Sequence, residues 1–267
     1  MISVIIPSYK NPHYLEIAIT SYLKTKSLES EMIVVIDGYE NVSSHLIEEY
    51  KNKINFIVFD ENSGMSHALN IGVQNAKYEK ILIINDDNVF CNKWDVNTIK
   101  HFTDDKKVIT SNQIEPEGQS IFNFIINNFG TNYDNFNFKN FLDFEDTIKR
   151  DEETNDGGIF PFVINKKYYM SVGGFDIAYN SPFVVDWDFF LKLELIGMKF
   201  VRIHDVNFYH FGSKATKKNS DMNTSKQFYE GEKIAREQFK DKWGFLPVRN
   251  IDNSHSPKNQ TFRGIKF

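Results

Sequence analysis

The sequence predicts an α/β fold in which a mostly parallel central sheet is flanked by helices. In the first hundred residues, four short apolar runs alternate with three segments of helical periodicity. Parallel strands need long crossover connections, and a helix between consecutive strands is the usual one. The apolar runs are nearly continuous, which is typical of strands that are covered on both faces.

The elements of this first part follow one another in a regular order. The run "SVIIPSY" (3–9) predicts a buried strand, and residues 11–26 predict a helix with Asn11 as its N-cap before Pro12. The same alternation predicts two more helices, at 43–52 and 66–77, and three more strands, at 31–39, 54–62 and 80–85.

Polar residues follow each of these predicted strands. The strand ends carry Pro7-Ser8-Tyr9, Asp37-Gly38, Asp60-Glu61-Asn62 and Asp86-Asp87-Asn88. The carboxyl ends of parallel strands meet at one edge of the sheet, and ligands bind at that edge in open α/β sheets. The sequence therefore predicts a ligand site there.

The second part of the chain is less regular. Residues 157–176 predict a strand, a helix and a Gly-Gly turn. An amphipathic helix is expected from 186 until Gly197 ends it, followed by a strand near 199–203 and a charged helix at 223–242.

Composition limits the function classes. The chain has 267 residues, 41% of them hydrophobic, which suffices for one large core or two small ones. The net charge of −5 gives no basic face, so no nucleic-acid partner is expected. A single cysteine, Cys91, excludes an internal disulfide. Without a signal-peptide pattern or an apolar run of about 18 residues, we expect a cytoplasmic protein with no transmembrane segment. Association with a membrane surface stays open.

The adjacent carboxylates of Asp86 and Asp87 are the strongest chemical signal. They repel each other unless a positive charge lies between them, and hard carboxylate oxygens suit Mg²⁺ or Mn²⁺. The alternative is a solvated Asp-Asp-Asn turn, which is common in surface loops.

Several segments, taken in order, resemble the family 2 glycosyltransferases. Their nucleotide-binding half is similar to "SVIIPSYKNPHYLEIAITSYL", "IVVIDGYEN" and "ENSGMSHALNIGVQNAKYEKILIINDDNVF". Their acceptor segment is similar to "VGGFDIAYNSPFVVDWDFFLKLELIGMKF". The Lys-Trp-Gly motif near the end of their domain is similar to "KDKWGF". The resemblance implies one GT-A domain over 1–245 with a Rossmann-like sheet. Its nucleotide-binding half would span 1–100 and its acceptor half 101–222, and a C-terminal tail would follow at 246–267.

The resemblance also implies an activity. Such an enzyme is an inverting glycosyltransferase that moves a sugar from a UDP- or dTDP-linked donor to a hydroxyl of a glycan or glycoconjugate, as in polysaccharide biosynthesis. The family pattern implies Mn²⁺ or Mg²⁺ as the cofactor. It does not identify the sugar, the acceptor or the oligomeric state.

The donor side is carried over one residue at a time. Pro7, Ser8 and Tyr9 match the first nucleotide-contacting loop, and Asp37 matches the aspartate that contacts the base. Asp86 is assigned to the ribose or the metal, and Asp87 is the better metal ligand. His210 is a third metal ligand or a packed core residue. His67 lies where many relatives place an arginine that faces phosphate, or it is an ordinary surface residue.

On the acceptor side, Asp186 inherits the role of catalytic base, which takes the proton of the acceptor hydroxyl. Trp187 and Asp188 are expected to contact the acceptor, and Gly174 forms a tight turn beside it. The alternative for both aspartates is capping of the helix.

Three departures keep rival interpretations open. The family usually carries acidic residues where this chain has Ile36, Ile84 and Val185. A catalytically silent nucleotide-sugar or glycan-binding module on the same fold is therefore the main alternative. A nucleotidyltransferase is disfavoured, because "PSYKNPHY" lacks a Gly-rich phosphate loop. The Phe- and Asn-rich stretch 119–145 is either compositional drift or an insertion that offers aromatic faces to a sugar.

Overall fold

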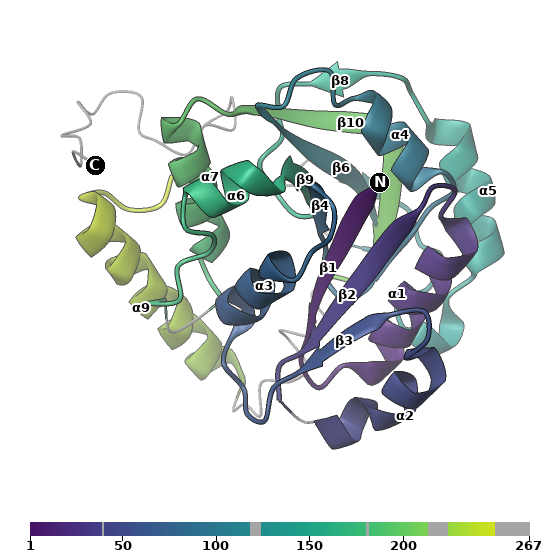
Figure 1. The fold of residues 1–267 in the computed structure, drawn as a ribbon, viewed down its shortest axis with the longest axis horizontal. Helices are drawn as coiled ribbons and strands as arrows, with labels where there is room; N and C mark the ends of the chain where they lie inside the picture. Colours follow the sequence, from purple (N-terminus) through teal and green to yellow (C-terminus); the bar gives the residue numbers. More distant parts are fainter. Residues whose placement is uncertain (39, 118–123, 180–181, 213–223, 249–267) are drawn as a thin grey trace.

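The computed structural model describes residues 1–38, 40–117, 124–179, 182–212 and 224–248 (Figure 1). All seven elements predicted for the first hundred residues are present, and so are the predicted strand, helices and turn of the second part. The strands are β1 (Ile2–Ser8), β2 (Ser30–Ile36), β3 (Asn55–Val58), β4 (Lys80–Ile83), β5 (Asn88–Val89), β6 (Lys107–Glu115), β7 (Ile125–Ile126), β8 (Glu153–Thr154), β9 (Phe162–Asn165) and β10 (Lys199–His210). The helices are α1 (Pro12–Thr25), α2 (Glu40–Tyr50), α3 (Met65–Gln74), α4 (Trp94–Lys100), the short 3-10 helix η1 (Tyr133–Asn135), α5 (Phe138–Ile148), α6 (Lys166–Ser171), α7 (Val185–Leu195) and α9 (Thr224–Trp243).

Within the described residues, these strands form one ten-stranded sheet. The order is β3-β2-β1-β4-β9-β6-β10-β5, with β7 beside β6 and β8 beside β10. The pairs β1–β2, β1–β4, β2–β3 and β6–β10 are parallel, whereas β9 runs antiparallel to both of its neighbours. The sheet therefore joins strands from both predicted halves of the chain.

Helices cover both faces of the sheet, as the continuous apolar runs predict. Val4 and Ile6 of β1 face a core that includes Trp94 of α4 and Phe141 of α5, whereas Ile5 faces the core beneath α3 and α7. Figure 1 shows α1, α2 and α5 on one side and α3, α6, α7 and α9 on the other. The prediction of an amphipathic α7 is wrong, because its residues are buried around most of the helix circumference where it packs between the sheet and α9.

Strand β10 is longer than predicted and carries a bulge. It advances four residues, from Ile203 to Asn207, while β6 advances only one, from Ser111 to Asn112. Three extra residues, 204–206, are accommodated in this way. The bulge therefore sets which residues of β6 pair with Asn207 and the residues after it on β10.

The bulge also contributes Asp205 to a partly buried ion-pair cluster centred on His101. Its Nε2 lies 3.0 Å from Asp205 and its Nδ1 lies 2.9 Å from Glu153. Lys100 and Lys107 complete the cluster at 2.6 Å from Asp205 and 2.9 Å from Glu153. Burial alone lowers the pKa of His101, but the two carboxylates outweigh it and raise the pKa above 6.5.

This cluster gives a pH-dependent prediction. Since the folded-state pKa is raised, the contribution of His101 to stability is fully present below the unfolded value and is lost as the pH rises through the folded value. We expect His101→Gln to lower the free energy of unfolding by about 1–3 kcal/mol below about pH 6. The gap to the wild type should narrow at higher pH. Urea unfolding over a pH series measures it, and a gap that widens as the pH rises would contradict the prediction.

No helix among the described residues is both long enough and apolar enough to cross a membrane.

Candidate active site

Asp86 lies buried where the ends of β1 and β4 meet. The Ser8 hydroxyl donates to Asp86 Oδ2 at 2.7 Å, and the Asn11 side-chain amide donates to Oδ1 at 3.0 Å. Burial and the neighbouring charge of Asp87 raise the pKa of Asp86 to about 7. The predicted cap role of Asn11 is wrong in its chemistry. Asn11 does precede α1, but its side chain makes no capping hydrogen bond and holds Asp86 instead.

Asp87 lies beside His210 because β5 pairs with the end of β10. His210 pairs with Asn88 in this antiparallel ladder, and the Phe211 N–H donates to the backbone oxygen of Asp87 at 3.2 Å. His210 Nε2 is 3.4 Å from Asp87 Oδ1, and its Nδ1 is 2.7 Å from Glu115 Oε1. We call Asp86, Asp87, Glu115 and His210 the acidic corner.

The electrostatics of the acidic corner are dominated by its carboxylates. Burial alone lowers the pKa of His210, but Asp87 and Glu115 outweigh it and raise this pKa to about 10. The His210 ring therefore lies between two carboxylates, one at each of its nitrogens. The solvated turn that the sequence left open is excluded, because Asp86 and Asp87 are each only 2% exposed.

Asp37 organises the loop before α3. Its carboxylate accepts hydrogen bonds from the backbone N–H groups of Ser63 and Gly64 at 2.6 and 2.9 Å, and from the Asn62 side chain at 2.9 Å. The Asp37 N–H donates to the backbone oxygen of Ser8 at 2.9 Å, which links this loop to the end of β1. Burial raises the pKa of Asp37, and these N–H groups oppose that effect.

The remaining donor-side residues lie around the same strand ends. Pro7 and Tyr9 are partly exposed on either side of the buried Ser8, and Lys10 lies over the Tyr9 ring. The ring of His67 packs edge-on against Phe59, 5.3 Å between centroids, and its charge lowers the pKa of Asp37. His67 is thus half-buried close to Asp37.

The acceptor-side predictions fall on α7 and the turn before it. Asp186 is partly exposed in the first turn of α7. The Arg236 guanidinium of α9 lies 5.8 Å from the centre of the Trp187 ring. Asp188 is fully buried and accepts hydrogen bonds from the indole N–H of Trp243 at 2.8 Å and from the hydroxyl of Tyr179 at 3.3 Å. These contacts favour a role for Asp188 in fixing α7 against α9, and acceptor contact stays a prediction.

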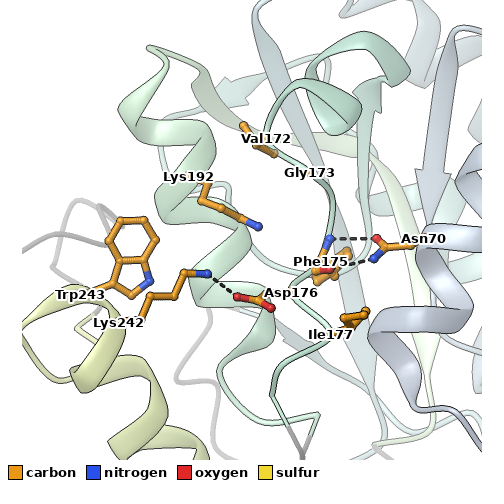
Figure 2. Close-up of a pocket in the computed structure, with 9 residues that line it drawn as sticks. All are labelled: Asn70, Val172, Gly173, Phe175, Asp176, Ile177, Lys192, Lys242 and Trp243. Carbon is orange, nitrogen blue, oxygen red and sulfur yellow. Dashed lines mark hydrogen bonds and ion pairs between the residues drawn. The ribbon is translucent and has the colours of Figure 1, made fainter. Parts of the chain in front are cut away.

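The Gly-Gly turn packs against α3 (Figure 2). Asn70 accepts from the Phe175 N–H at 2.9 Å and donates to the Phe175 carbonyl at 2.8 Å. A pocket of about 520 Å³ opens beside this turn, between α3, α7 and α9, and Lys192 and Lys242 line it. Its lining includes none of the predicted donor or metal residues, so it is separate from the acidic corner.

The two glycines of this turn make different stability predictions. Both have a positive φ, +76° at Gly173 and +66° at Gly174. A Cβ at Gly174 would lie 2.8 Å from Tyr169 Cε1 and still closer to Asn70 Oδ1, whereas one at Gly173 would meet nothing within 4 Å. We expect Gly173→Ala to cost about 1 kcal/mol of folding stability and Gly174→Ala about 2–4 kcal/mol. Equal losses in chemical denaturation would show that the close packing is unimportant.

Sequence reasoning missed four contributors to this region. They are Asn11, which holds Asp86; Asn62 and Ser63, which hold Asp37; and Glu115, which holds His210. Asn62 lies at a predicted strand end and Asn11 at a predicted helix start directly after one, so their positions were a usable signal. Glu115 depends on the β10 bulge, which no local pattern shows.

Among the described residues, a tight group of potential metal ligands lies away from the acidic corner. His101, Asp151 and Asp205 offer ligand atoms within 4.8 Å of one another, in a search restricted to the described residues. Lys100 already contacts both aspartates, at 2.9 and 2.6 Å. We therefore assign this group to the stability cluster described above.

The described part of the Phe- and Asn-rich stretch packs beside the acidic corner; residues 118–123 lie outside the described part. Phe136 packs against Tyr209 and Phe211, at 4.8 and 5.2 Å between ring centroids, and these two residues flank His210. Phe129 and Phe141 also contact Tyr209. These rings belong to or pack against the core, which favours a packing role for the stretch over the display of aromatic faces.

Comparison with solved structures identifies the fold. GalNAc-T7, solved with UDP, GalNAc and Mn²⁺, superposes with a TM-score of 0.62 at 14% identity over 79% of this chain and 43% of its own. Staphylococcus aureus TarS in complex with UDP gives 0.55 at 18% identity over 91% of this chain and 72% of its own. The fold is therefore GT-A.

The family follows from the sequence match. The Glycosyl transferase family 2 model matches residues 3–169, more than half of the chain, which therefore belongs to glycosyl transferase family 2. An uncharacterized glycosyltransferase of Rickettsia prowazekii is 33% identical over 90 residues, 34% of this chain and 28% of that protein. The poly-beta-1,6-N-acetyl-D-glucosamine synthase of Staphylococcus aureus is 27% identical over 109 residues, 40% of this chain and 26% of the synthase. The matched part is thus about a quarter of these curated relatives.

Proposed function

We propose that the chain catalyses an inverting, metal-assisted transfer of a sugar from a UDP- or dTDP-linked donor to a hydroxyl of a glycan or glycoconjugate. The observation that carries this proposal is the acidic corner at the carboxyl edge of the sheet, where the buried Asp86 and Asp87 are adjacent in the chain and Asp87 lies 3.4 Å from His210. Solved relatives of the same fold bind UDP, and one also holds Mn²⁺, which supports this choice of donor and cofactor.

The donor types of the acidic corner suit a divalent cation. The pKa of His210, raised to about 10 by Asp87 and Glu115 despite burial, indicates a strong local excess of negative charge. Asn88 Oδ1 is also buried and has no hydrogen-bond partner among the described residues. Carboxylate, carbonyl and imidazole groups suit Mn²⁺, and the oxygens suit Mg²⁺. Asp87, Asp86 and His210 would hold the cation, which when bound supplies positive charge against the diphosphate.

The residues of this chain have separate roles in the proposed reaction. Asp37, next to the Ser63 and Gly64 N–H groups, contacts the base, while Ser8 and Asn11 hold Asp86 in place for the ribose or the cation. Asp186 takes the proton of the acceptor hydroxyl as its oxygen bonds to the anomeric carbon. The bond from that carbon to the diphosphate oxygen breaks in the same step, so the configuration inverts. Gly174 and Trp187 remain our proposed acceptor-side residues.

Thermal unfolding with UDP, dTDP and GDP, each with and without Mn²⁺, tests the donor and cofactor. We expect UDP or dTDP to raise the melting temperature in the presence of Mn²⁺, because a ligand that binds only the folded state stabilises it. Release of free nucleotide from the matching nucleotide sugar, measured with an acceptor present, then tests transfer. Binding without any release or transfer would instead indicate a catalytically silent module, and no binding would contradict both readings.

A further inference from the structure

Glu115 occupies the side of His210 that faces away from Asp87. Its carboxylate lies 2.7 Å from Nδ1, the ring nitrogen that does not face Asp87. The His210 and Glu115 side chains are only 10% and 18% exposed. Among the described residues, His210 is the only basic side chain that forms an ion pair with Glu115. The Glu115 carboxylate therefore pairs with the His210 imidazole.

The fold fixes this contact through the backbone. Ile114 of β6 pairs with Tyr209 of the parallel β10, so the next residues of the two strands, Glu115 and His210, lie side by side. On its other edge, Glu115 pairs with Ile126 of β7, and the Asn127 N–H donates to its carbonyl at 2.9 Å. If β10 continued past Ile203 without the bulge, so that His204 paired with Asn112, Asn207 would take the place of His210.

A histidine held in this way has a defined orientation. A carboxylate that accepts from Nδ1–H keeps the proton on Nδ1, fixes the ring plane and leaves Nε2 to act on its other side. Here that other side is Asp87, at 3.4 Å. Carboxylate partners of this kind raise the basicity of a metal-ligating imidazole.

We propose that Glu115 is a positioning residue for the cation site, acting through the Nδ1–H of His210 so that Nε2 is kept on the side of Asp87, where it would be available to hold Mn²⁺ or Mg²⁺. This inference rests on the proposed metal-assisted function and adds to it a residue from β6. Glu115 does not touch the cation or the substrate. Its effect is on how strongly the acidic corner binds the cation.

Calorimetric titration with Mn²⁺ alone tests the proposal. Loss of a partner that orients a ligating histidine costs about 10- to 100-fold in metal affinity, so we expect Glu115→Ala to weaken Mn²⁺ binding by that factor. Glu115→Gln should have a smaller effect, because its amide oxygen still accepts from Nδ1–H. The matched control is Glu117→Ala, since Glu117 is an exposed carboxylate two residues further along. It should bind as the wild type does.

A double-mutant cycle separates positioning from general support of the fold. In a His210→Ala background, Glu115→Ala should cause no further loss of Mn²⁺ affinity, because the residue through which it acts is gone. Unchanged Mn²⁺ affinity in both Glu115 variants, or a full additional loss of affinity in the His210→Ala background, would overturn this inference but not the proposed metal-assisted function. Should Glu115→Ala not fold, Glu115→Gln carries the cycle. A wild type that binds no Mn²⁺ would overturn the metal-assisted function and this inference together.

Discussion

Asp186→Asn is expected to lower kcat about 10²- to 10⁴-fold, the usual contribution of a positioned general base. Asn has nearly the same shape, but its amide cannot take a proton from the acceptor hydroxyl. Asp186 lies partly exposed in the first turn of α7, where an acceptor can reach it. Asp188, two residues further along the helix, cannot replace Asp186, because its carboxylate is fully buried against Trp243 and Lys242.

Initial rates at saturating nucleotide sugar measure this effect, and titration of the nucleotide measures binding separately. We expect nucleotide affinity to stay within about threefold of the wild type, because the change acts on the chemical step and not on donor binding. Glu194→Gln, a carboxylate change near the other end of the same helix, is the matched control and should leave kcat unchanged. A near-normal kcat for Asp186→Asn would remove Asp186 from its role.

The first half of the fold was predictable because its signals are local. Each of the strands β1 to β4 is a short apolar run, and each intervening helix has its own periodicity, so no long-range information was needed. The convergence of polar residues followed from one rule about parallel strands, and Ser8 and Asp86 do meet at a hydrogen bond of 2.7 Å. Adjacency in space was thus inferred from topology alone.

The parts that were not predictable depend on register or on packing between distant elements. Glu115 lies beside His210 only because a bulge shifts the register of β10 by three residues. No pattern in the sequence of β6 or β10 predicts that bulge. Asp188 lies at a predicted helix start, where the sequence predicts an acceptor contact or a cap. Its burial depends on α9, whose Trp243 comes 55 residues later in the chain. The role of Asn11 could not be predicted from local sequence either. An asparagine at this position can cap the helix or donate a hydrogen bond to Asp86, and the residue type is the same in both cases.

Asp87→Ala is expected to lower kcat/KM about 10²- to 10³-fold, as expected when a major electrostatic contribution to the transition state is removed. Asp87 joins the end of β4 to His210, and without it the proposed cation loses its best oxygen ligand. The pKa of Asp86 should fall as well, because the charge of Asp87 is, after burial, the main cause of its rise. That relief of repulsion should offset part of the lost contact with His210, so the melting temperature without metal should change little.

This one change should therefore lower activity strongly while leaving the metal-free melting temperature nearly unchanged, and that separation is the test. The wild type should be stabilised by Mn²⁺ together with UDP or dTDP, and Asp87→Ala should lose that stabilisation along with its activity. Asp134→Ala is the matched control, because this exposed carboxylate, like Asp87, raises the pKa of Tyr14 and so lies near the same corner, yet it has no assigned role. A variant Asp87→Ala that keeps both its turnover and its response to Mn²⁺ would show that the diphosphate is neutralised elsewhere. In that case the burial of two adjacent aspartates at the carboxyl edge would need another explanation.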